Sequence, residues 1–168
     1  WTLSRGLGDV YKRQKIKRLV FLGNLFYSLL TVTPFFAILL YFKNIDVIII
    51  AYALFLFFML LLKDITKDLK NLKGDFSLDY KTIPVVFGEG FTKAILSLIA
   101  FINIFLLFNL YFNFSEGYMT IFYGLSLILL LVFLIKLFLS KKVSDYLFLH
   151  NILSCLLYTS PSPRDRVQ

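Results

Sequence analysis

Charged residues are scarce in this sequence and make up only 17% of its 168 residues. Soluble domains carry about a quarter. Here 59% of the residues are hydrophobic, and the mean hydropathy is +0.79, so little polar surface is left to cover a water-soluble fold. The high hydrophobicity also excludes a disordered chain. Because there are only eight glycines and one cysteine, a collagen and a disulfide scaffold are excluded as well.

The excess of positive charge does not indicate a nucleic-acid-binding module. The formal net charge is +8 at pH 7. The basic residues lie at the ends of long apolar runs, however, and this is where membrane proteins place them. We therefore expect the lipid bilayer, and no nucleic acid, as a partner.

The two ends of the chain have an unusual relation to each other. Residues 4–14 and 155–165 can be encoded by one DNA sequence read on its two strands, which resembles a sequencing-library adaptor translated at both ends of an insert. We therefore expect residues 1–14 and 155–168 to be artefactual, and 15–154 to be a partial domain cut at both ends. The alternative is a genuine basic arm and tail. The only cysteine, Cys155, falls in the second of these segments and so does not indicate a redox compartment.

Long apolar runs predict membrane-spanning helices. Each run is close to the ~20 residues that cross a bilayer core as a helix. The runs cover residues 19–40, 47–62, 94–112 and 118–135, and a fifth helix begins near residue 145. The predicted fold class is an all-α, polytopic transmembrane helix bundle with four full spans and the start of a fifth.

Lysines and arginines predict how the bundle sits in the membrane. Six lysines lie between the second and third spans, and none lies between the third and fourth. Positively charged loops stay on the cytoplasmic side. We therefore expect an integral protein of the cell (inner) membrane, with the loop 63–93 in the cytoplasm.

A few polar residues fall inside the spans or beside them. Asn24, Asn103 and Asn109 indicate helix packing and interhelical hydrogen bonds more than substrate contacts. His150 is the only histidine, and a single histidine without a partner is more often a packed core or interface residue than a catalyst.

The segment that carries chemistry is KDITKDLKNLKGD, residues 63–75. On a helical wheel Asp64, Asp68, Asn71 and Asp75 fall within about 60° of one another, whereas the lysines form a separate face. The helix is expected to loosen at Gly74, directly before Asp75.

Carboxylates four residues apart on one face repel each other, so the stripe is explained if it binds a divalent cation. Mg²⁺ is usually held by carboxylates, water and substrate phosphates, and flanking lysines can bind further phosphate oxygens. The alternative is a solvated juxtamembrane helix whose lysines contact anionic lipid headgroups.

A resemblance to a known family supports the metal site. The Asp-rich stretch, the following Gly74-Asp75 and the run KTIPVVFG at 81–88 resemble the second Asp-rich motif of UbiA-type intramembrane prenyltransferases. The similarity is closest to the geranylgeranylglycerol-phosphate geranylgeranyltransferase branch. Asn71 stands where that branch usually has Asp, which removes one charge from the metal site.

The resemblance implies a bundle of about nine helices, of which this chain would form the fifth to eighth and the start of the ninth. It also implies Mg²⁺-dependent transfer of a prenyl group from an isoprenoid diphosphate, such as geranylgeranyl diphosphate, to a membrane acceptor such as geranylgeranylglycerol phosphate. No catalytic residue is assigned. The implied metal ligands are Asp64, Asp68, Asn71 and Asp75, and the implied diphosphate ligands are Lys63, Lys67 and Lys81.

The first Asp-rich motif of that family is absent, so we expect this chain to hold half a site and to be inactive alone. Two alternatives remain open. One is an aromatic acceptor, as in quinone biosynthesis. The other is a non-enzymatic membrane scaffold or transporter fragment, for which ionisable positions at the bilayer midplane would be more natural.

Overall fold

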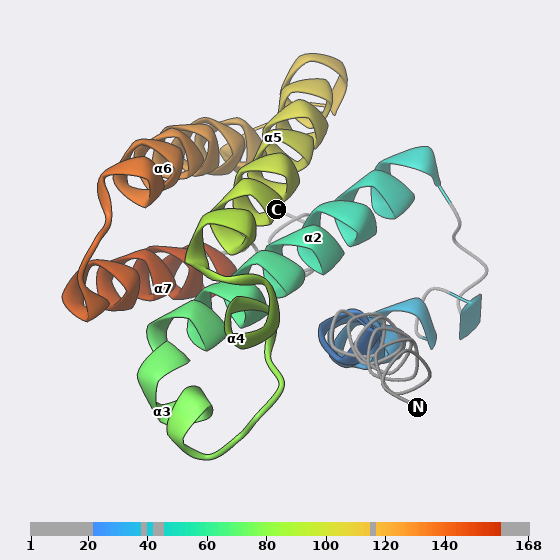
Figure 1. The fold of residues 1–168 in the computed structure, drawn as a ribbon. Helices are drawn as coiled ribbons and strands as arrows, with labels where there is room; N and C mark the ends of the chain where they lie inside the picture. The colour runs from blue at the N-terminus through green and yellow to red at the C-terminus, as the bar shows by residue number, and fades with distance from the viewer. Residues whose placement is uncertain (1–21, 38–39, 42–45, 115–116, 159–168) are drawn as a thin grey trace, which may run out of the picture.

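A computed structural model describes residues 22–37, 40–41, 46–114 and 117–158 of the chain (Figure 1). All regular structure in these residues is helical, which confirms the predicted all-α class. Three of the helices, α2, α5 and α6, are long and apolar enough to cross a membrane. The helices are Leu22–Ala37, α2 Val47–Lys70, α3 Leu72–Ser77, α4 Ile83–Phe87, α5 Glu89–Phe114, α6 Tyr118–Leu139 and α7 Val143–Tyr158.

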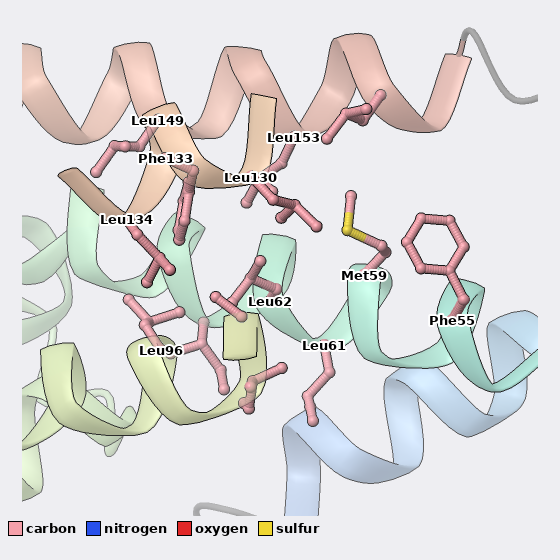
Figure 2. Packing of buried hydrophobic residues seen from close by; sticks show 14 of the residues in the cluster. Phe55, Met59, Leu61, Leu62, Leu96, Leu130, Phe133, Leu134, Leu149 and Leu153 are labelled. Carbon is pink, nitrogen blue, oxygen red and sulfur yellow. The ribbon is translucent and has the colours of Figure 1, made fainter. Parts of the chain in front are cut away.

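Four of the helices form a closed ring. α2 packs against α5 and α7, and α6 packs against the same two helices from the other side. In the part of the chain that the structure describes, the diagonal pairs α2–α6 and α5–α7 make no backbone contact. The helix Leu22–Ala37 lies on the side of α2 that faces away from α6 (Figures 1 and 2).

The core fills the middle of this ring. Leu62 of α2, Leu96 of α5, Phe133 of α6 and Leu153 of α7 are fully buried and converge from the four helices (Figure 2). Each buried aliphatic or aromatic side chain of this size contributes about 1.5–3 kcal/mol in water. In a bilayer this contribution is smaller, and close packing between the helices holds the ring instead.

The outward surface of the bundle is also apolar. On α5, Leu98, Phe101, Phe105, Phe108 and Phe112 recur at helical spacing and are more than half exposed. A soluble helix of this length would turn a polar face to water. This surface therefore suits lipid tails or further helices.

The helices extend beyond the predicted spans, and much of the predicted loop 63–93 is helical. α2 continues eight residues past the apolar run to Lys70, and α5 begins at Glu89. The expected loosening at Gly74 is wrong. The interruption lies at Asn71, where ψ is 6°, and Gly74 is inside α3. Asparagine competes with the backbone for hydrogen bonds, which favours a helix end.

A tight cap at Asp79 turns the chain from α3 toward α4. The N–H of Asp79 donates to the carbonyl of Phe76 at 3.4 Å, and the N–H of Tyr80 donates to that of Asp75 at 2.9 Å. This is the Schellman arrangement, which requires a left-handed residue. Asp79 supplies it with φ 57°, a conformation that aspartate tolerates better than most residues.

The predicted first and fifth helices are described in part. Residues 19–21 and 38–39 of the first predicted span lie outside the described residues. The fifth helix, α7, begins at Val143, two residues before the predicted start, and runs through Cys155 to Tyr158. The Asp145 carboxylate accepts hydrogen bonds from the N–H groups of Lys141 and Lys142 at 3.2 and 3.1 Å. These bonds hold the pKa of Asp145 below its usual value.

Candidate metal and diphosphate site

The centre of the candidate site is Asp68, in the last turn of α2. Its carboxylate is partly buried and lies within electrostatic range of Asp64, Asp75 and Lys67. Asp64 lies one turn earlier on the same helix, whereas Asp75 comes from α3. The break at Asn71 therefore does not remove Asp75 from the stripe that the helical wheel predicts.

The fourth predicted ligand, Asn71, is exposed at the end of α2, where its backbone N–H donates to the carbonyl of Lys67 at 3.0 Å. Within the described ranges, no three His, Cys, Asp or Glu side chains are gathered closely enough to hold one ion. The three carboxylates are thus near one another without converging on one point. This fits a metal whose remaining ligands come from substrate phosphates and water.

The three predicted phosphate-binding lysines lie in different places. Lys67 is exposed and interacts electrostatically with both Asp64 and Asp68. Lys81 is exposed in the extended segment before α4. Lys63 points toward α7, where its ammonium group lies 5.5 Å from the centroid of the Tyr158 ring. The geometry therefore places Lys67 beside the carboxylates and directs Lys63 toward α7.

The segment that contains Lys81 is shaped by its own sequence. Thr82 is extended, and proline follows in the first turn of α4, where its missing N–H is not needed. Gly88 ends α4 with φ 87°, a conformation that suits glycine. Its carbonyl accepts the hydroxyl of Thr92 at 2.8 Å, which ties α4 to the start of α5.

One residue of the site was not recognised from the sequence. The amide Nδ2 of Asn24 donates to Oδ2 of Asp68 at 2.9 Å and joins the helix Leu22–Ala37 to α2. The predicted interhelical hydrogen bond is therefore confirmed for Asn24. The sequence indicated a polar position there. It did not indicate that the partner of Asn24 would be Asp68, which lies 44 positions further along the chain.

The other polar positions behave differently. Asn109 donates to the carbonyl of Phe105 on its own helix at 3.2 Å, and no interhelical bond of its side chain is found among the described residues. Asn103 is fully buried, and neither of its amide atoms has a partner among the described residues. His150 of α7 is partly buried beside the backbone of Lys63 on α2, as expected of an interface residue.

Comparison with known proteins gives a family. The sequence model of the UbiA prenyltransferase family matches residues 7–154. The searches of curated proteins and of solved structures gave no match. The family match begins inside the segment 1–14 and ends at residue 154, the predicted end of the partial domain. The artefactual origin of the two ends stays a prediction.

Proposed function

Because the chain belongs to the UbiA prenyltransferase family, whose members transfer prenyl groups within membranes, we propose that its Asp-rich face binds Mg²⁺ and an isoprenoid diphosphate. The observation that supports this proposal is the environment of the Asp68 carboxylate. It is partly buried beside two other carboxylates, and no ion pair with it is found in the described part of the chain. A divalent cation would relieve this repulsion.

Each group has its own task in this site. Asp64, Asp68 and Asp75 are the proposed carboxylate ligands, of which one or two would bind the metal directly, and Asn71 would add a neutral oxygen at the turn where α2 ends. When bound there, Mg²⁺ would supply positive charge that neutralises the diphosphate and stabilises it as a leaving group. Lys67 lies beside the carboxylates and binds phosphate oxygens that the metal leaves free. Lys81, which is exposed before α4, and Lys63, which is directed toward α7, are the further lysines that we propose contact the diphosphate.

The resemblance of the motif supports a particular substrate pair. We propose a geranylgeranyl donor and geranylgeranylglycerol phosphate as the acceptor, because residues 63–84 follow the pattern of that branch at most positions. Asn71 departs from that pattern, and it lowers the negative charge of the site. The alternative is an aromatic acceptor. A comparison of prenyl transfer to the two kinds of acceptor would distinguish them.

The site lies at one end of the bundle. The six lysines of residues 63–93 support placing this end on the cytoplasmic face of the cell membrane. The chain supplies the second Asp-rich half of the site, and the first half has to come from another segment. The isolated chain is therefore proposed to bind the diphosphate without transferring the prenyl group.

Binding of geranylgeranyl diphosphate to the chain in lipid nanodiscs tests the proposal. We expect binding with Mg²⁺ and little binding with EDTA. The substitution Asp68→Ala should weaken the Mg²⁺-dependent binding by about tenfold or more, since it removes a metal ligand.

The matched control is Asp46→Ala. Asp46 precedes α2 at the opposite end of the same helix, is exposed, and makes no capping hydrogen bond through its side chain. This variant should bind as the unchanged chain does. Equal loss in both variants, or loss in neither, would contradict the proposed function.

A further inference from the structure

The contact between Asn24 and Asp68 has a chemical direction. A carboxylate only accepts hydrogen bonds, so the group facing Oδ2 of Asp68 is the NH₂ of the amide. Asn24 is buried, with 9% of its surface exposed, and the bond is 2.9 Å long. One oxygen of Asp68 is thereby fixed on the side of α2 that faces the helix Leu22–Ala37.

The donor is neutral, and this matters for the charge of the site. A lysine or arginine at position 24 would form an ion pair and cancel the charge of Asp68. The asparagine orients the carboxylate but leaves its negative charge and its other lone pairs available. Among the described residues, the nearby charges that act on Asp68 are Asp64 and Asp75, which repel it, and Lys67. Metal-binding carboxylates are commonly oriented by such hydrogen bonds.

A second polar residue on the same helix faces inward. Ser28 lies one turn after Asn24, is fully buried, and its hydroxyl has no hydrogen-bond partner within the described ranges. A buried hydroxyl without a partner is costly, and it commonly marks a place where another group completes the contact. The face of the helix Leu22–Ala37 that meets α2 is therefore polar over two successive turns.

We propose that Asn24 is a positioning residue of the metal site: its amide holds the Asp68 carboxylate in the orientation that binds the cation. This inference rests on the proposed function, because it assigns Asn24 to the same site. It adds a side chain from outside the Asp-rich segment and makes the helix Leu22–Ala37 part of the metal-binding unit.

Mn²⁺ titration followed by electron paramagnetic resonance tests this role on the full chain in nanodiscs. Asn24→Leu keeps the number of side-chain heavy atoms but removes the donor, and it should weaken Mn²⁺ binding by roughly 10- to 100-fold. In the background of Asp68→Ala, the same change should have no further effect, because the carboxylate that it orients is gone. A purely structural role would give the same loss in both backgrounds.

The matched control is Asn109→Leu, which replaces an exposed asparagine whose amide donates to its own helix, and Mn²⁺ affinity should not change. Asn24→Ser stays small and polar but is too short to reach Asp68, so it replaces the leucine variant if that chain does not fold. Full Mn²⁺ affinity in the variants at position 24, with affinity lost in Asp68→Ala, overturns the role of Asn24 and leaves the proposed function standing. Full affinity in Asp68→Ala overturns both.

Discussion

At the scale of single residues, Asn103 is an energetically costly position among the described residues. Its side chain is fully buried on α5, and neither Oδ1 nor Nδ2 has a partner in the described part of the chain. Burying an unpaired amide costs about 1–3 kcal/mol. Asn103→Leu keeps the heavy-atom count and removes both polar atoms, so the thermal unfolding temperature in detergent should rise.

Asn109→Leu is the comparison for this prediction. Asn109 is exposed and bonds to the carbonyl of Phe105, so its replacement should change the unfolding temperature little. If Asn103→Leu lowered the unfolding temperature well below that of Asn109→Leu, the amide of Asn103 would have a favourable contact in the folded protein, and this account of the position would be wrong.

Asn24, Asn103 and Asn109 also show what a sequence can predict at the scale of single residues. Their position inside apolar runs marks all three as polar exceptions, but it gives no partner. Wheel arithmetic relates Asp64 to Asp68 because both lie on one helix. The contact of Asn24 with Asp68 depends on how two helices slide and rotate against each other, which the sequence of either helix alone does not contain.

At the scale of elements, a polar cluster ties α5, α6 and α7 together at one end of the ring. Tyr146 of α7 donates its hydroxyl to Glu89 of α5. Lys93 pairs with Glu89 at 3.0 Å, donates to the carbonyl of Ser140 at 2.6 Å, and lies 5.4 Å from the centroid of the Tyr146 ring. Ser140 connects α6 to α7, so three side chains and one backbone carbonyl hold three helix ends.

Removing the hydroxyl of Tyr146 tests this cluster. Tyr146→Phe should destabilise the bundle by about 1–2 kcal/mol, because a hydrogen bond to a charged group is lost and Glu89 is only partly exposed. Thermal unfolding in detergent measures the change. Tyr118→Phe is the control, since Tyr118 is 83% exposed at the other end of α6. Equal unfolding temperatures for the two variants would show that the cluster does not stabilise the ring.

The helices themselves follow from hydropathy, but their ends do not. The apolar runs place the cores of α2, α5 and α6 correctly, because a buried or lipid-facing helix must be apolar along its length. The apolar run that predicts a span ends at residue 62, whereas the helix α2 continues to Lys70. Residues 63–70 are polar but rich in good helix formers such as lysine and leucine, so α2 extends through them.

At the scale of the whole molecule, the ring brings all of the candidate site to one end. α2 ends there with Asp64 and Asp68, α3 and α4 cap it, and α5 starts from it (Figure 1). The order of helices around the ring could not be predicted from the sequence, because four apolar helices can pack in several ways. The outward faces stay apolar, which suits a bundle completed by lipid or further helices.

The central claim of this account is that carboxylates of the Asp-rich face and an isoprenoid diphosphate share one metal ion. Electron–nuclear double resonance measures this directly on a chain labelled with ¹³C at its aspartate carboxylates, with Mn²⁺ and geranylgeranyl diphosphate bound. We expect couplings of the same Mn²⁺ to both ³¹P and ¹³C, with the ¹³C coupling weakened in Asp68→Ala. A Mn²⁺ ion that couples to ³¹P and to no protein ¹³C would contradict the claim.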